Sequence, residues 1–515
     1  MNLVDVLLNN VRRYPGKMAL VCGDTRLTYQ AFNERCNRLT HVLSRFGLGK
    51  GDHFALFSKN CHRHFEMFFA AAKTGTALVP LNYRLSAREL AYIINDSESK
   101  ILFFAKEYAP MVEIIQKELK RVKSYVCTDD SIIGISSYEE LLSHSDPSEP
   151  DSASIVEEDV VTILYTSGTT GYPKGAMISH RNRVMDMIQQ VVDFEYIEPD
   201  DTHLIVGPLY HVGALANSHA HFYMGCTMVV LDQFNPQRIF ELIEKEKLRS
   251  LWGAPTMIQM LIDFPEAEKF DRSSLKTISY AGSPMPVEIL KKAIRFFGEN
   301  LFLQFYGMTE TGPTITRLRR KDHVLQGTEK QLKRLSSAGV ESQHVHVRIV
   351  DHEGMDLAPN KVGEIVVKSD GIMQGYWKKP EETEQAIKKG WFYTGDMGYM
   401  DEDRYVYIVD RKKDMIISGG ENVYSAEVEN TLYMHPAVSE AAAIGVPDKK
   451  WGETVKAIVV LKPGIHATEE EIIDHCKKNL ASYKKPTSVE FEAELPKSSS
   501  GKVLKWRLRE LYGKN

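Results

Sequence analysis

A glycine-rich loop that directly follows an apolar run constrains this chain more than any other feature. Residues 160–164 read VVTIL, and residues 165–177 read YTSGTTGYPKGAM. The apolar run predicts a buried strand, and the glycines after it let the backbone curl so that its N–H groups point inward at an anion. The stretch also supplies hydroxyl donors and one positive charge, from Thr166, Ser167, Thr169, Thr170 and Lys174. The loop therefore predicts a polyphosphate site at the end of a strand.

This loop differs from a Walker A loop. That motif needs glycine, lysine and then serine or threonine in direct succession. Here Pro173 precedes Lys174, and Gly175 follows it. A short loop of glycine, serine and threonine is usually an exposed turn. The coincidence of a strand, several hydroxyl groups and a lysine favours phosphate binding instead.

Length and composition limit the class of protein. A chain of 515 residues predicts at least two domains, one of them large. The net charge of −5 gives no reason to expect a nucleic-acid partner. Six scattered cysteines without a CxxC pair argue against a disulfide framework or zinc site and favour a reducing compartment, so we expect a cytoplasmic protein. No apolar run is long enough to predict a membrane span.

The order of predicted elements indicates an α/β fold. Apolar strands and amphipathic helices alternate through the first part of the chain, and the pattern resumes at residues 160–165 and runs past Gly312. Such alternation predicts helix-covered, mainly parallel sheets. The strands expected early are 18–21, 26–29, 53–57 and 77–80, with helices at 32–46 and 65–73.

The later part of the chain has a different pattern. Short β-branched runs at residues 362–367 and 404–409 predict a smaller, more antiparallel β subdomain. From about residue 412 we expect a separate compact α+β unit that ends in a basic helix after Gly501. Its predicted elements are strands at 441–444, 455–460 and 489–491 and a helix at 469–479.

Four further motifs carry chemistry. Residues 304–310 (QFYGMTE) place a carboxylate beside a hydroxyl, which suits Mg²⁺ because that ion prefers oxygen ligands. Residues 280–286 (YAGSPMP) form a turn whose glycine permits close approach of a ligand. Residues 393–396 (YTGD) end in an aspartate that can accept two hydrogen bonds from a vicinal diol. Residues 496–502 (PKSSSGK) form a Ser/Gly loop with a terminal lysine.

Together these motifs resemble those of the acyl-adenylate-forming enzymes, which include acyl- and aryl-CoA synthetases, adenylation domains and firefly luciferase. The resemblance covers nearly the whole chain. It implies a large N-terminal domain, expected at residues 1–411, and a small mobile C-terminal domain at residues 412–515 that turns about Lys413. The implied reaction joins ATP and a carboxylic acid into acyl-AMP and pyrophosphate, then transfers the acyl group to coenzyme A.

The resemblance also implies roles for single residues. Tyr306 would lie on adenine, Thr309 would touch the α-phosphate and Glu310 would hold Mg²⁺. Asp396 would bind both ribose hydroxyls beside Arg411. The complete set expected to bind ATP and AMP is Thr166, Ser167, Gly168, Thr169, Thr170, Lys174, Gly282, Ser283, Gln304, Phe305, Tyr306, Asp396 and Arg411.

The remaining implied residues serve the acid and coenzyme A. Lys502 would place an ammonium between the carboxylate and the α-phosphate, where it lowers repulsion and stabilises the developing charge. We prefer it to Lys497 and Lys505 because it directly follows a glycine. Gly419 and Gly420 would line the path of the pantetheine arm. The acid pocket would comprise His211, Val212, Gly213, Gly282, Gly307 and Thr314, with His211 near the carboxylate.

Several alternatives stay open at this point. The acceptor could be a carrier protein, or the chain could be an inactive binding homologue. The pocket strings 208–216 and 251–260 are neutral and largely apolar, which favours a CoA ligase for an apolar acid over an amino-acid adenylating enzyme. Small residues such as Gly213 suggest a roomy pocket, so a medium- or long-chain fatty acid is the first expectation and an aromatic acid the second. The resemblance also makes a homodimer plausible.

Overall fold

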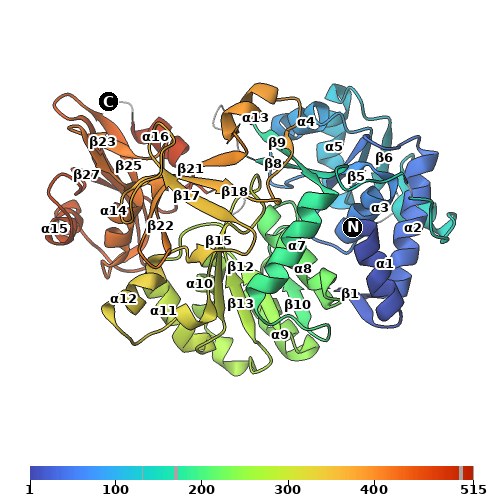
Figure 1. Cartoon of the computed structure of the whole chain (residues 1–515), viewed down its shortest axis with the longest axis horizontal. Helices are drawn as coiled ribbons and strands as arrows, with labels where there is room; N and C mark the ends of the chain where they lie inside the picture. The colour runs from blue at the N-terminus through green and yellow to red at the C-terminus, as the bar shows by residue number, and fades with distance from the viewer. Residues whose placement is uncertain (130–131, 153, 167–171, 498–502, 514–515) are drawn as a thin grey trace.

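The computed structural model in Figure 1 describes residues 1–129, 132–152, 154–166, 172–497 and 503–513. Most of the chain folds into two mainly parallel sheets with helices packed on their faces, followed by a small antiparallel sheet and a separate α+β unit. The α/β class predicted from the alternating pattern is confirmed. The first and last parts of the chain lie at opposite sides of the molecule in Figure 1, with the C-terminal strands in orange and red.

The first large sheet is parallel in its centre and antiparallel at its edges. In spatial order its strands are β16 (Val340–Glu341), β15 (Thr316–Leu318), β14 (Phe302–Tyr306), β13 (Thr277–Tyr280), β12 (Ser250–Gly253), β10 (Thr202–Ile205), β11 (Thr227–Val230), β1 (Met18–Cys22) and β2 (Thr25–Thr28). The strands from β14 to β1 pair in parallel. The carboxyl ends of β12, β13 and β14 therefore open on the same edge, where ligands of parallel sheets usually bind.

The second large sheet carries the glycine-rich loop. Its strands, in spatial order, are β19 (Gly375–Tyr376), β9 (Lys174–Ser179), β8 (Val160–Thr166), β4 (Ala77–Pro80), β3 (His53–Phe57), β5 (Ile101–Phe104), β6 (Ser124–Cys127) and β7 (Ser136–Ser137). β8 is the strand predicted from the apolar run, and it pairs with β4 in parallel and with β9 in antiparallel fashion.

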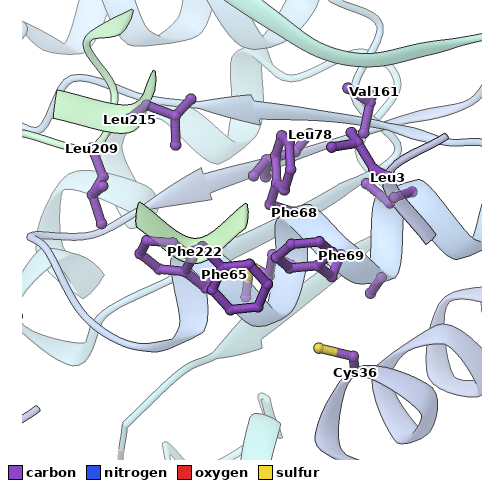
Figure 2. Close-up of a cluster of buried hydrophobic side chains, with 14 of the residues drawn as sticks. Leu3, Cys36, Phe65, Phe68, Phe69, Leu78, Val161, Leu209, Leu215 and Phe222 are labelled. Atoms are coloured by element: carbon purple, nitrogen blue, oxygen red, sulfur yellow. The ribbon is translucent and has the colours of Figure 1, made fainter. Parts of the chain in front are cut away.

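Helices cover both sheets and join them through one core. They are α1 (Leu3–Arg13), α2 (Tyr29–Arg45), α3 (Arg63–Thr74), α4 (Ala87–Asp96), α5 (Ala109–Ile115), α6 (Tyr138–Ser143), α7 (His180–Phe194), α8 (Val212–Tyr223), α9 (Pro236–Glu246), α10 (Pro255–Ile262), α11 (Val287–Phe297), α12 (Glu329–Lys333) and α13 (Pro380–Ala386). Figure 2 shows Phe65, Phe68 and Phe69 of α3 beside Phe222 of α8. The rings of Phe69 and Phe222 lie 4.7 Å apart between centroids, so this core packs a helix of one sheet on a helix of the other.

The later strands form two smaller sheets. The first contains β17 (His346–Val350), β18 (Gly363–Lys368), β21 (Trp391–Met400), β20 (Ile387–Lys388) and β22 (Val406–Arg411). The second contains β24 (Glu421–Val423), β23 (Ile416–Ser418), β26 (Gly452–Leu461), β25 (Val438–Asp448) and β27 (Ser488–Phe491), with α14 (Ser425–Tyr433), α15 (Glu469–Asn479) and α16 (Lys505–Tyr512). We call residues 412–515 the C-terminal unit below, and its boundary stays a prediction.

Most local elements agree with their sequence patterns. The predicted strands at 53–57 and 77–80 are β3 and β4 with the same bounds, and the predicted helix at 469–479 is α15. Within the parts of the chain that the structure describes, we find no helix with the length and apolar character that crossing a bilayer would require.

Candidate active site

The base of the glycine-rich loop is a pair of antiparallel strands. β8 and β9 pair so that Thr166 lies opposite Lys174, which brings a hydroxyl and an ammonium to the same place. Gly175 has no room for a side chain, because a Cβ atom there would lie 2.6 Å from Cγ2 of Ile163. The other predicted loop residues, Ser167, Gly168, Thr169 and Thr170, fall outside the described residues. Their contact with phosphate stays a prediction.

A carboxylate from another strand end meets the base of this loop. Oε1 of Glu310, a buried side chain, accepts hydrogen bonds from Oγ1 of Thr166 at 3.1 Å and from the hydroxyl of Tyr376 at 3.0 Å. Nζ of Lys174 lies 5.1 Å from the centre of the Tyr376 ring. Burial and the nearby Glu310 carboxylate raise the pKa of Tyr376, so its phenol stays protonated and donates. One buried carboxylate, two hydroxyls and one ammonium therefore lie together at the base of the loop.

Tyr306, Asp396 and Arg411 form a second polar cluster. The Tyr306 hydroxyl donates to Oδ2 of Asp396 at 2.6 Å, and Nε of Arg411 donates to Oδ1 at 2.6 Å. Asp396 and Arg411 are partners across β21 and β22. Burial and the Asp396 carboxylate raise the pKa of Tyr306. Burial works to lower the pKa of Arg411, but Asp396 and other negative neighbours outweigh it and raise that pKa.

This cluster suits a ligand with adjacent hydroxyl groups. An ionised carboxylate offers about four acceptor positions, and Asp396 uses two of them for Tyr306 and Arg411. Each carboxylate oxygen therefore keeps a lone pair for a further donor. The structure brings together three residues predicted as one set, although they are separated by up to 105 positions in the numbering from Tyr306 to Arg411.

The residues predicted to bind the nucleotide also include the turn after β13 and the end of β14. Gly282 has φ of +97°, and a Cβ atom there would meet nothing within 4 Å, so this glycine faces open space. Ser283 and Gln304 are half-buried. Phe305 instead packs in the core, with its ring 5.1 Å from that of Phe194. Any contact of Phe305 with a nucleotide would come from its backbone.

Gly307 and Thr314, two residues predicted for the acid pocket, lie against other parts of the protein chain. A Cβ atom on Gly307 would lie 2.3 Å from the carbonyl oxygen of Pro313, so this glycine lets two backbone segments approach each other. Thr314 is buried, and its carbonyl oxygen accepts a hydrogen bond from Nε2 of Gln189 at 2.6 Å. Its hydroxyl has no hydrogen-bond partner among the described residues. Thr309 is half-buried close to Glu310 in the chain.

The predicted acid side lies at the start of α8. His211 precedes this helix, and its ring centroid lies 4.7 Å from that of Tyr210. Val212 and Gly213 open the helix and are half-buried. A Cβ atom on Gly213 would lie 2.9 Å from Cζ2 of Trp252, a buried residue of β12. The space at Gly213 is thus occupied by an indole, whereas the sequence suggested that it was open.

Gly207 also makes room for the Trp252 indole. A Cβ atom on Gly207 would lie 2.4 Å from Cζ3 of Trp252 and 2.9 Å from Cβ of Ala214. Trp252 therefore fills the space between the end of β10, the first turn of α8 and the sheet. One step along the same helix face, Nδ2 of Asn217 donates to Oγ of Ser279 at 3.3 Å, which closes α8 on β13.

The C-terminal unit carries the remaining predicted residues. Lys413 is exposed in the turn between β22 and β23. Gly419 and Gly420 have φ of +61° and +86° and form the two-residue turn between β23 and β24, as expected for a tight hairpin. Gly420 faces open space, while Gly419 packs under Trp451. Lys502 falls outside the described residues, and the pair Lys497 and Val503 brackets its loop.

Sequence reasoning missed two residues at this site. Tyr376 binds Glu310 from the short strand β19, and the string at residues 374–377 (QGYW) could have drawn attention to it. Trp252 lies in the stretch 251–260, whose neutral and largely apolar character does not single it out. A large aromatic residue beside small residues of another segment gives no local signal, because their contact depends on packing.

Nearly the whole chain is similar to proteins of known function. Residues 7–377 match the family described as AMP-binding enzyme, and residues 427–502 match its C-terminal domain. A feruloyl-CoA synthase from Amycolatopsis is 36% identical over 98% of both chains. The long-chain-fatty-acid–CoA ligase FadD13 from Mycobacterium tuberculosis is 35% identical over 95% of this chain and 94% of its own. The crystal structure of the anthranilate CoA ligase AuaEII with anthranoyl-AMP aligns with a TM-score of 0.91 and 26% identity, over 99% of this chain and 97% of its own.

Proposed function

The chain belongs to the AMP-binding enzyme family as an AMP-forming acid–CoA ligase, and we propose that its acid is a compact, apolar aromatic acid. The observation that carries this proposal is the contact of Trp252 with Gly207 and Gly213. The indole takes up space directly beside the predicted acid pocket. A long alkyl chain needs depth there, whereas a flat ring needs less.

The charge of the pocket walls supports the same class of acid. Residues 208–216 and 251–260 contain no Asp, Glu, Lys or Arg. A free amino acid would bury its ammonium there without a partner, which costs several kcal/mol, on the order of three or more. We therefore expect neither α-amino acids nor other zwitterions as substrates.

In the first half-reaction, a carboxylate oxygen attacks the α-phosphorus of ATP and pyrophosphate leaves. We assign adenine to Tyr306 and the ribose hydroxyls to Asp396, whose free lone pairs suit a diol. Lys174 would bind the outer phosphates. Lys502 would lie between the acid and the α-phosphate and stabilise the charge that develops there. Thr309 would contact the α-phosphate, and His211 would lie at the acid carboxylate.

Glu310 is the residue that would hold Mg²⁺. Mg²⁺ is usually bound by one or two carboxylates together with phosphate oxygens. Glu310 is a buried carboxylate whose Oε1 accepts hydrogen bonds from two neutral hydroxyls. These surroundings fit a cation that arrives with ATP. When bound, the ion would neutralise phosphate charge.

In the second half-reaction, the sulfur of coenzyme A attacks the acyl carbonyl of acyl-AMP and AMP leaves. We assign the pantetheine path to Gly419 and Gly420, and the turn between the two half-reactions to Lys413. Such a movement lets one site serve two reactions. A carrier protein as acceptor remains the second candidate, and a side-by-side assay with CoA and a phosphopantetheinylated carrier decides between them. The cytoplasmic location and the homodimer stay predictions.

The test of the proposed acid compares acids of graded length and shape, each with ATP and CoA. We expect the highest kcat/KM with aromatic acids of one ring. Trp252→Ala should raise the relative kcat/KM of medium- and long-chain acids by about 10-fold or more, because even one methylene is worth about 10–200-fold in a shaped pocket. Trp391→Ala removes the same side chain from β21 and should leave the preference unchanged. A wild-type preference for long-chain acids would contradict the proposal.

A further inference from the structure

A network of charged and polar groups joins β22 to the C-terminal unit. The Asp410 carboxylate accepts hydrogen bonds from the backbone N–H of Ser425 at 2.5 Å and from its hydroxyl at 2.9 Å. Nζ of Lys505 also donates to the Ser425 hydroxyl, and it pairs with Oε1 of Glu429 at 2.7 Å. Three elements, β22, α14 and α16, thus meet in one connected group.

The network is shielded from water. Ser425 is fully buried and Asp410 is 7% exposed, while the Lys505 side chain is 15% exposed. Burial raises the pKa of Asp410. It works to lower the pKa of Lys505, but Glu429 and Asp410 outweigh it and raise that pKa. Since buried charges are unfavourable without partners, removing one member strongly affects the others.

Asp410 is also next to the nucleotide side of the site. Its neighbour Arg411 binds Asp396, which in turn accepts from Tyr306. Successive residues of a strand point to opposite faces, so the end of β22 directs Arg411 to the proposed ribose site and Asp410 to the C-terminal unit. The same short segment therefore serves both regions.

Lys505 lies at the other end of the connection, directly after the predicted lysine loop. Lys497 and Val503 pair as an antiparallel bridge, and the N–H of Leu504 donates to the carbonyl oxygen of Pro496 at 2.8 Å. Lys497 also pairs with Glu440 at 2.6 Å. Both ends of the loop are therefore held together, and α16 begins at Lys505, so a shift of Lys505 moves the base of the loop.

We propose that Asp410 is a positioning residue that holds α14 and α16, and with them the described ends of the lysine loop at Lys497 and Val503, on β22 through Ser425 and Lys505. Lys413 lies between Asp410 and Ser425 in the chain. A turn of the C-terminal unit about Lys413 must therefore change the contacts of Asp410, whereas the pair of Lys505 with Glu429 lies within that unit and stays intact. Asp410 then favours one arrangement of the C-terminal unit over the other. This inference rests on the proposed two-step reaction.

The test measures both half-reactions separately on the full chain: pyrophosphate release from acid and ATP, and thioester formation from supplied acyl-AMP and CoA. Asp410→Ala should change the ratio of the two rates by about 10-fold, since hydrogen bonds of a charged group that are lost in one arrangement shift the balance by that order. Lys505→Met should change the ratio in the same direction. Asp410→Asn, which keeps one acceptor oxygen, should restore part of the wild-type ratio.

Two controls separate positioning from general damage. Arg509→Met removes the pair with Asp414, which lies within the C-terminal unit, and should leave the ratio unchanged. The double variant Asp410→Ala/Lys505→Met should change the ratio no more than Asp410→Ala alone, because both act through one connection. Fluorescent labels on the large part of the chain and on the C-terminal unit should report an altered distance distribution in Asp410→Ala.

The outcomes are distinct. A ratio within about twofold of wild type in both folded Asp410 variants, with an unchanged label distance, would overturn the positioning role. Equal loss of both half-reactions with an unchanged label distance would overturn it as well. A wild-type chain that performs neither half-reaction would instead contradict the proposed function, because Asp410 would then have no reaction to position.

Discussion

The proposed ribose side (Tyr306, Asp396 and Arg411) and the proposed acid side (Gly207, Gly213 and Trp252) are built in different ways. On the ribose side, Tyr306 and Arg411 reach the Asp396 carboxylate through two bonds of 2.6 Å. On the acid side, Gly207 and Gly213 make room for Trp252, and no charge is involved. Hydrogen bonds require a ligand whose polar atoms lie at fixed distances and angles. An apolar pocket wall selects its ligand only by the volume that the packed side chains leave free. We infer that the first region suits a ligand that never changes and the second can be retuned by single substitutions.

The largest expected effect concerns the C-terminal unit, which carries Lys502 and Gly420. It tests whether these directed groups, like the polar groups of the ribose side, each serve one defined role. Lys502→Ala should reduce acyl-AMP formation by about 10²–10³-fold, because it removes a group that stabilises developing charge. The same variant should still convert supplied acyl-AMP and CoA into thioester. Gly420→Leu should show the opposite pattern, since its side chain would obstruct the pantetheine path. Equal loss of both half-reactions in both folded variants would contradict this division of roles.

The next effect concerns the ribose side itself. Asp396→Ala leaves the Arg411 guanidinium and the Tyr306 hydroxyl without their shared partner. Loss of a hydrogen bond to a charged group is worth about 1.5–3 kcal/mol, so the net loss of one such bond predicts a fall in kcat/KM for ATP of about 10–100-fold, with the KM for the acid nearly constant. Asp403→Ala, which removes an exposed carboxylate of the same β-rich region, is the matched control. An equal rise in the KM for the acid would contradict the separation of the ribose side from the acid side.

A smaller effect is expected on the acid side. Gly213→Ala places a Cβ atom 2.9 Å from the Trp252 indole, and overpacking of this kind typically destabilises a fold by about 1–3 kcal/mol. We expect a lower Tm and a changed order of preferred acids, with an unchanged KM for ATP. Trp252→Leu in the same chain should recover the Tm. Gly49→Ala, where a Cβ atom meets nothing within 4 Å, should behave like wild type in both respects.

The smallest effect concerns the glycine-rich loop. Thr170→Val removes one neutral hydroxyl, and such a hydrogen bond contributes about 0.5–1.5 kcal/mol. We expect the KM for ATP to rise by a few-fold, up to about tenfold, with the Tm and the preference among acids unchanged. ATP saturation curves at fixed acid and CoA measure it. ATP kinetics identical to wild type would remove this hydroxyl from the phosphate site.

Local patterns were enough to predict the elements that carry the site. The apolar run at residues 160–164 lies in β8, and the motif at 304–310 begins in β14. The motifs, through their family resemblance, also predicted Tyr306, Asp396 and Arg411 as one set. The strand predictions are confirmed because a strand and a glycine turn are each encoded within a few neighbouring residues, and the structure brings the three motif residues into contact.

The sequence by itself therefore determined the α/β class and the family, and it predicted which residues would bind the nucleotide. Only the tertiary structure decided what Gly213 faces and what Lys505 binds. The partner of Gly213 is an indole 39 positions further along the chain, and Lys505 reaches back to Ser425 across 80 positions. Nothing in either local pattern reports such a partner, because side-chain volume and buried charge are matched between segments only when the sheets and helices pack.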